Sequence, residues 1–165
     1  MDFQYVIDEV FSRLEQEDIQ YALIGGFAMA MRGVQRATID LDLLLLQQDL
    51  TRADEIFLAQ GYSLVFRSDN VSHYSARGDQ LGRLDVLHAF RGPSLAMLDR
   101  AEHLEVGPGT TLPVARIEDI IGLKIQAAYN DPERAEQDWL DIRSMVTAAR
   151  VSEQDLDWEL ISDYL

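Results

Sequence analysis

The spacing of apolar residues changes along the chain between the three-to-four interval of helices and the runs typical of strands. Segment 2–17 carries apolar side chains at helical spacing, and Asp2 stands at its start as a cap. In chain order, the pattern predicts a helix over 2–17, a strand over 21–24, a helix over 27–31 ending at Gly33, a strand over 38–46, a helix over 49–60 with Asp49 as its cap, strands over 62–67, 71–77 and 81–88, and a helix over 94–100.

Turn residues divide the rest of the chain in the same way. Asp69-Asn70 and Gly78-Asp79 separate the three successive strands and predict a meander, and the turn 107–109 separates two weak strands. The remainder is expected to be helical, with helices over 117–129, from the break at Asp131-Pro132 to about 150, and from a Ser152 cap onward, where Leu156, Leu160 and Ile161 share one side. The pattern predicts an α+β fold, in which a mixed β-sheet over 20–115 is flanked by helices and followed by a helical C-terminal part over 116–165, all in a single domain 1–165.

Composition narrows the possible chemistry. The 165 residues contain no cysteine, which excludes disulfides, zinc-thiolate sites and a thiol nucleophile. Neither a signal peptide nor a membrane-spanning run is present, so a soluble cytoplasmic protein without a membrane partner is expected. The net charge of −15 disfavours a polyanionic partner at first sight, but residues 1–20 and 151–165 each contribute −5, and the 130 residues between them also carry only −5.

The strand over 38–46 contains two acidic residues at alternate positions. Side chains alternate across a strand, so Ile39, Leu41, Leu43 and Leu45 share one face, while Thr38, Asp40, Asp42 and Leu44 share the other. Two carboxylates side by side repel each other unless a cation lies between them, and a hard divalent cation such as Mg²⁺ prefers such oxygen ligands. The alternative is a solvent-facing strand whose acids only protect a sheet edge.

Two further features favour the metal-site interpretation. Gly25-Gly26 follows a strand and opens a helix, which is a geometry suited to binding a phosphate through backbone N–H groups, although a plain tight turn is the alternative. Asp85 stands within an apolar strand, opposite in face to Leu84 and Val86, where an unpaired carboxylate is costly. Other polar and aromatic residues suggest less: the three histidines (His73, His88, His103) have no partner at ligand spacing, and Trp139 and Trp158 favour core or partner packing.

Segment 24–45 resembles the nucleotidyltransferase domain of the DNA polymerase β superfamily, and is most similar to bacterial abortive-infection type nucleotidyltransferases, several of which are toxins of toxin–antitoxin pairs. The residues that carry the resemblance are those of the glycine turn and of the strand with its approach, namely Gly25, Gly26, Ala28, Gly33, Arg36, Thr38, Asp40 and Asp42. Further along, Asp85 matches the third carboxylate of the family, and Lys124, Asp138 and Asp141 match positions on its C-terminal helices. The likeness spans residues 21–145.

The resemblance implies a transfer of NMP from an NTP to an acceptor hydroxyl of a tRNA, a protein or a small molecule. It implies that Asp40, Asp42 and Asp85 are catalytic and hold two Mg²⁺ ions. It also implies that Gly25, Gly26, Arg36, Thr38 and Lys124 bind the nucleotide, and that an antitoxin can be a partner. Alternatives stay open for four residues: Lys124 as a surface lysine, Arg36 as a salt-bridge residue, and Asp138 with Asp141 as capping or surface-pairing residues.

A second hypothesis is a non-catalytic nucleotide-binding or antitoxin-like partner protein that retains the same fold. A purely structural domain is a third, but it leaves Asp85 unexplained. Transfer of label from an NTP separates the first hypothesis from the other two.

Overall fold

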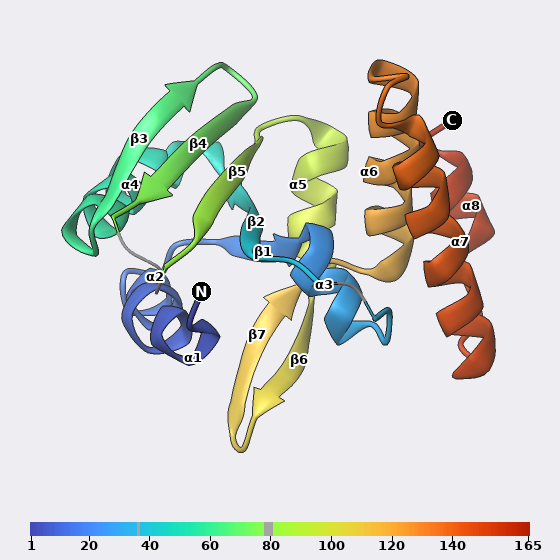
Figure 1. The fold of residues 1–165 in the computed structure, drawn as a ribbon, viewed down its shortest axis with the longest axis horizontal. Coiled ribbons are helices and arrows are strands. Elements are labelled where there is room, and N and C mark those ends of the chain that lie inside the picture. Colours follow the sequence, from blue (N-terminus) through green and yellow to red (C-terminus); the bar gives the residue numbers. More distant parts are fainter. Residues whose placement is uncertain (36, 78–80) are drawn as a thin grey trace.

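The computed structural model describes residues 1–35, 37–77 and 81–165, so that Arg36 and the predicted turn at Gly78-Asp79 lie outside the described part. A seven-stranded mixed sheet forms the centre of the molecule (Figure 1), with the order β3-β4-β5-β2-β1-β7-β6. The strands are β1 (Tyr21–Ile24), β2 (Asp40–Leu46), β3 (Tyr62–Arg67), β4 (Val71–Ala76), β5 (Arg83–Ala89), β6 (Glu102–Gly107) and β7 (Thr110–Val114). The pairs β2/β5 and β1/β7 are parallel and the other neighbours are antiparallel, which confirms both the mixed sheet and the meander of β3, β4 and β5.

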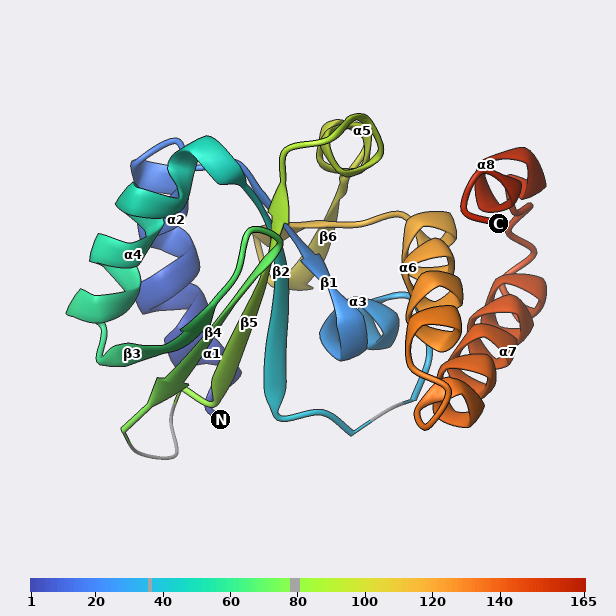
Figure 2. The same ribbon diagram turned by 90° about the horizontal axis from the view of Figure 1, so that it is seen from above.

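Helices cover both faces of this sheet. They are α1 (Phe3–Val6), the π-helical turn η1 (Ile7–Phe11), α2 (Ser12–Gln16), α3 (Gly25–Met31), the 3₁₀ turn η2 (Gln47–Asp49), α4 (Leu50–Ala59), α5 (Gly92–Asp99), α6 (Ile117–Asn130), α7 (Ala135–Val151) and α8 (Trp158–Ser162). Figure 2 shows α4 and the N-terminal helices on one face of the sheet and α3 and α6 on the other, with α7 and α8 outside α6. The predicted α+β fold with a helical C-terminal part is confirmed.

The central strand β2 is covered on both sides. Leu41, Leu43, Leu44 and Leu45 have no exposed surface, so the apolar run lies in the core whichever way each side chain points. The prediction for the start of this strand was wrong by two residues: β2 begins at Asp40, and Ile39 is 72% exposed because it precedes the paired strand. No described helix is long and apolar enough to cross a membrane.

Three predictions about helix caps and aromatic residues need correction. Asp49 precedes α4 but its side chain makes no capping hydrogen bond; it accepts hydrogen bonds from the Gln20 backbone N–H and from Arg52. Ser152 ends α7, and α8 starts at a later cap, Asp157, which accepts from the Leu160 N–H at 3.0 Å. For Trp139 and Trp158 the core alternative is wrong, since they are 43% and 60% exposed, and packing against a partner stays a prediction.

Candidate functional site

The candidate site begins at the turn between β1 and α3. Gly25 has φ +64°, a conformation that favours glycine, and a Cβ atom built there would lie 2.0 Å from Oδ2 of Asp42. A Cβ atom on Gly26 would lie 2.8 Å from Cβ of Thr38. Both glycines are therefore required because the backbone passes directly against side chains of β2 and of the segment before it.

The strand register brings two of the three predicted carboxylates together. Asp42 lies opposite Asp85 in the parallel pair β2/β5, so their side chains leave the same face of the sheet. Asp40 lies two residues earlier on that face, opposite Arg83. The flanking Leu41, Leu43, Leu84 and Val86 are fully buried on the opposite face, as the alternation predicted.

Negative charges are crowded on this face of the sheet. Burial raises the pKa of Asp42 to about 6, and the negative charges of Asp85 and, to a lesser extent, Asp40 add to the rise. The Gly26 backbone N–H and the Lys124 ammonium lower that pKa but do not offset the other causes. At neutral pH the folded protein therefore keeps Asp42 ionised, although the charges of Asp85 and Asp40 repel it.

A pocket of about 330 Å³ opens at this position. It is lined by Gly25, Asp42 and Asp85 from the sheet side and by Lys124 and Asp138 from the helices. The pocket therefore collects residues that the sequence singled out from five separate segments of the chain.

Lys124 is not a surface lysine. Its ammonium lies 2.8 Å from Asp138 Oδ1 and 2.8 Å from Asp141 Oδ2, and only 15% of its side chain is exposed. The two carboxylates are 1% and 4% exposed, so the alternative of surface pairing is wrong for both. Oδ2 of Asp138 is buried and has no hydrogen-bond partner among the described residues. This buried cluster ties α6 to α7 at the edge of the pocket.

Two predicted nucleotide-binding residues remain, Thr38 and Arg36, and Thr38 does not line the pocket. The Thr38 hydroxyl packs against Gly26 and donates to the Asp40 carbonyl oxygen at 3.2 Å. Arg36 is not among the described residues, so its predicted role stays a prediction.

Two side chains that the sequence did not single out complete the surroundings of Asp85. His73 Nδ1 lies 2.6 Å from Asp85 Oδ1, and Arg83 lies 3.2 Å from Asp85 Oδ2. His73 lies in a strand, as expected, but its hydrogen bond to Asp85 was not predicted, because the observed register differs by one residue from that of a two-residue turn at Gly78-Asp79. His88 and His103 lie in strands as expected, and burial lowers the pKa of His88.

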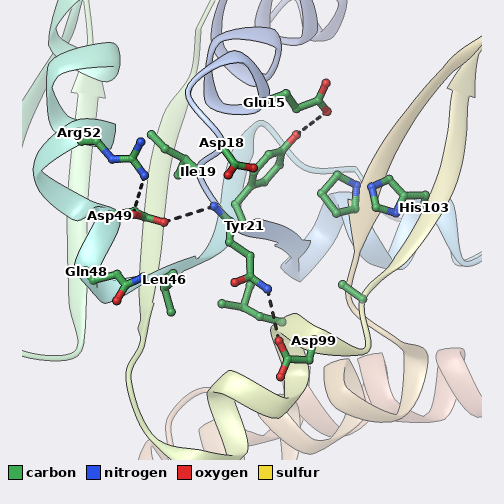
Figure 3. A pocket seen from close by; sticks show the side chains of 14 residues that line it. Glu15, Asp18, Ile19, Tyr21, Leu46, Gln48, Asp49, Arg52, Asp99 and His103 are labelled. Carbon is green, nitrogen blue, oxygen red and sulfur yellow. Dashed lines mark hydrogen bonds and ion pairs between the residues drawn. The ribbon is translucent and has the colours of Figure 1, made fainter.

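A larger hollow, of about 700 Å³, lies at the other end of β1 and β2, beside Tyr21 and Leu46 (Figure 3). Its polar groups bond one another. Arg52 lies 2.8 Å from Asp49, and the Gln20 side chain donates to Asp99 at 3.4 Å. Burial raises the pKa of Tyr21, whose hydroxyl donates to Glu15. The acids here are held by protein donors, and the predicted site residues lie elsewhere.

Comparisons with known proteins place the fold. No protein-family model matches the sequence, and no curated protein matches it significantly. Solved structures do match. The crystal structure of ANT(2'')-Ia in complex with adenylyl-2''-tobramycin has a TM-score of 0.71 at 17% identity, covering 96% of this chain and 94% of that chain.

Two further structures agree with this match. The solution structure of the antibiotic-resistance factor ANT(2'')-Ia has a TM-score of 0.70 at 21% identity and covers 99% of this chain and 90% of that chain. The lincomycin-bound lincosamide antibiotic adenylyltransferase LnuA has a TM-score of 0.59 at 17% identity and covers 88% of this chain and 95% of that chain. The sheet of this protein and the helices around it therefore have the fold of the nucleotidyltransferases, as the sequence resemblance implied.

Proposed function

We propose that the protein is a Mg²⁺-dependent nucleotidyltransferase that moves NMP from an NTP to an acceptor hydroxyl. The observation that carries the proposal is the pair Asp42 and Asp85, held opposite each other on parallel strands at a pocket that also contains Gly25 and Lys124. Burial and, after it, the charge of Asp85 raise the pKa of Asp42, so its ionised form is costly to keep, and such a cost is typical of functional sites.

The donor set suits Mg²⁺ in one specific way. Among the described residues, no group of three or more acidic or histidine side chains is close enough to hold a metal ion unaided. Mg²⁺, however, is commonly held by one or two carboxylates together with substrate phosphates. Asp42 and Asp85, with Asp40 beside them, fit a metal that arrives with the triphosphate, in the two-ion arrangement that the resemblance implies. When bound, Mg²⁺ would screen the charge of the phosphates and lower the pKa of the acceptor hydroxyl.

The residues of the chain supply the rest of the mechanism. The acceptor oxygen forms a bond to the α-phosphorus, the bond from that phosphorus to the bridging oxygen breaks, and pyrophosphate leaves. Asp85 lies where it can orient the acceptor hydroxyl and accept its proton. Lys124 uses two of its three N–H groups on Asp138 and Asp141, which leaves one to donate to a phosphate oxygen.

The glycine turn and the segment that precedes β2 are proposed to bind the nucleotide as well. We assign backbone contacts with the triphosphate to Gly25 and Gly26, and the flanking Arg36 and Thr38 to the same substrate.

Of the three acceptor classes, a small molecule has the most support. The similar structures were solved with adenylyl-2''-tobramycin and with lincomycin, and this chain spans at least 94% of each of those two proteins. The net charge of −15 also opposes a long polyanion such as tRNA. Membership of the abortive-infection type, a toxin role and an antitoxin partner rest on the sequence resemblance alone.

The test is incubation with Mg²⁺ and each α-labelled NTP, with cell extract, a tRNA pool and a panel of hydroxylated antibiotics as separate acceptor sources. Label is expected on one acceptor fraction and is expected to disappear in the double variant Asp40→Asn and Asp42→Asn. Transfer that persists in this variant would contradict the carboxylate mechanism. Nucleotide binding without transfer to any fraction would favour the non-catalytic partner protein instead.

A further inference from the structure

His73 occupies a defined position next to the third carboxylate. In the antiparallel pair β4/β5 it lies directly opposite Asp85, and its Nδ1 approaches Asp85 Oδ1 to 2.6 Å. An ionised carboxylate can only accept a hydrogen bond, so Nδ1 must carry the proton and donate it. The bond fixes one oxygen of Asp85 on the side of β4.

A β-bulge in the neighbouring strand holds the imidazole ring. Leu64 pairs with Tyr74, but the next pair is Phe66 with His73, so Val65 is an extra residue in β3. Without this insertion Val65 would lie opposite His73. With it, the ring of Phe66 stacks on the imidazole, with centroids 5.5 Å apart and an interplanar angle of 28°. Bulges of this kind are common beside active sites, where they redirect a side chain.

This arrangement contributes little to the stability of the fold. The side chains of His73 and Asp85 are 37% and 22% exposed, and pairs at that exposure have small effects on folding. Phe66 is 51% exposed, so its ring gains little from burial and its clear contact is with the imidazole. The bulge, the stacked ring and the hydrogen bond all act on one thing, the orientation of the Asp85 carboxylate.

We infer that His73 is a positioning residue, clamped by Phe66, that holds the Asp85 carboxylate in the orientation needed at the pocket. Asp85 lines that pocket and lies opposite Asp42, so a rotation of its carboxyl group would change which oxygen faces a substrate. Arg83 contacts Oδ2 at 3.2 Å and Oδ1 at 3.4 Å but is itself largely exposed, so His73 makes the shorter and better shielded contact. The inference rests on the proposed nucleotidyltransferase activity.

The test compares three variants of His73 that differ in whether, and where, they keep a hydrogen-bond donor for Asp85. His73→Leu removes the donor, His73→Asn retains an N–H near the position of Nδ1, and His73→Gln moves it one bond further away. With Mg²⁺, α-labelled NTP and the acceptor fraction that the wild type labels, His73→Leu is expected to lower kcat about 10- to 100-fold, as loss of a supporting hydrogen bond typically does, with the KM for NTP unchanged. We expect His73→Asn to recover most of that loss and His73→Gln to recover little of it.

The neighbouring strand supplies matched controls. Phe66→Ala is expected to lower kcat in the same direction but less, while Val65→Ala, an exposed neighbour on the same bulge, leaves kcat unchanged. An equal kcat in wild type and His73→Leu would overturn the inference. So would equal losses in His73→Leu and His73→Asn, since the donor would then have no role.

A second measurement does not depend on activity. In ¹⁵N-labelled protein, the His73 Nδ1–H proton is expected as a protected downfield resonance that is lost in Asp85→Asn, and its absence from the wild type would overturn the inference. If the wild type transfers no label to any acceptor, the proposed function fails, and this resonance still decides whether His73 holds Asp85.

Discussion

Two groups of carboxylates in this protein lie in opposite electrostatic situations. Asp138 and Asp141 are almost fully buried and share the ammonium of Lys124, which offsets one of their two charges where they stand. Asp42 and Asp85 lie on adjacent strands, and burial together with the charge of Asp85 raises the pKa of Asp42 to about 6. The first group joins two helices, whereas the second keeps negative charge at the pocket that Arg83, in contact with Asp85, and Lys124 offset only in part. Substitutions should therefore have opposite effects in the two groups.

The largest effect is expected for Asp42→Asn on activity. Asp42 would hold the Mg²⁺ that screens the charge of the phosphates, and loss of such a ligand costs several kcal/mol in the transition state, so transfer should fall about 1,000-fold. The same substitution removes the repulsion with Asp85, so the free energy of unfolding at pH 7 should stay equal or rise. Activity is measured by label transfer and stability by urea denaturation. A large loss of stability would show that Asp42 belongs with the structural carboxylates.

Lys124→Met is expected to lower stability, in addition to the weaker NTP binding that its proposed contact with phosphate implies. It leaves two buried carboxylates without a counter-charge, and breaking a buried ion pair from one side typically costs about 3–5 kcal/mol. The triple variant Lys124→Met, Asp138→Asn, Asp141→Asn removes all three charges and should recover much of that loss. The comparison is made by urea denaturation at pH 7. Full stability in Lys124→Met alone would contradict the structural role of the cluster.

The pH dependence of stability provides a smaller effect. Because the pKa of Asp42 is higher in the folded protein than the ordinary 3.8, the folded state binds more protons than the unfolded state between about pH 4 and 6. The free energy of unfolding should therefore fall as the pH rises through that interval, by up to about 3 kcal/mol from this group. The difference between wild type and Asp42→Asn isolates this contribution, and parallel pH profiles for the two proteins would refute it.

The same contrast explains what the sequence could and could not predict. Alternation along β2 and β5 was enough to place Asp42 and Asp85 on one face, since a strand has a fixed two-residue period. The cluster around Lys124 was not predictable in the same way, because its members meet only when α6 and α7 pack, and sequence spacing does not determine helix packing. His73 was missed for a different reason: a two-residue turn at Gly78-Asp79 would pair position 73 with position 84, whereas the observed register pairs it with Asp85.

The smallest effect is expected at two glycines that share a left-handed backbone. Gly25 and Gly33 have φ of +64° and +86°, and a side chain in that region costs about 1–2 kcal/mol. A Cβ atom at Gly33 would meet nothing within 4 Å, so Gly33→Ala should show the backbone cost alone. At Gly25 the Cβ atom would also overlap Asp42, so Gly25→Ala should lose more stability and should displace the carboxylate that the site requires.

Comparing Gly25→Ala with Gly33→Ala in Asp42 variants also tests whether the turn at Gly25 depends on contact with the Asp42 side chain. In the Asp42→Asn background the Oδ2 position is still filled by a side-chain atom, so the extra cost of Gly25→Ala over Gly33→Ala should persist. In an Asp42→Gly background that atom is gone, and the two glycine substitutions should cost the same in urea denaturation. If the difference between them survived in Asp42→Gly, contact with Asp42 would not be the reason that Gly25 is needed, and the turn would be set by its backbone alone.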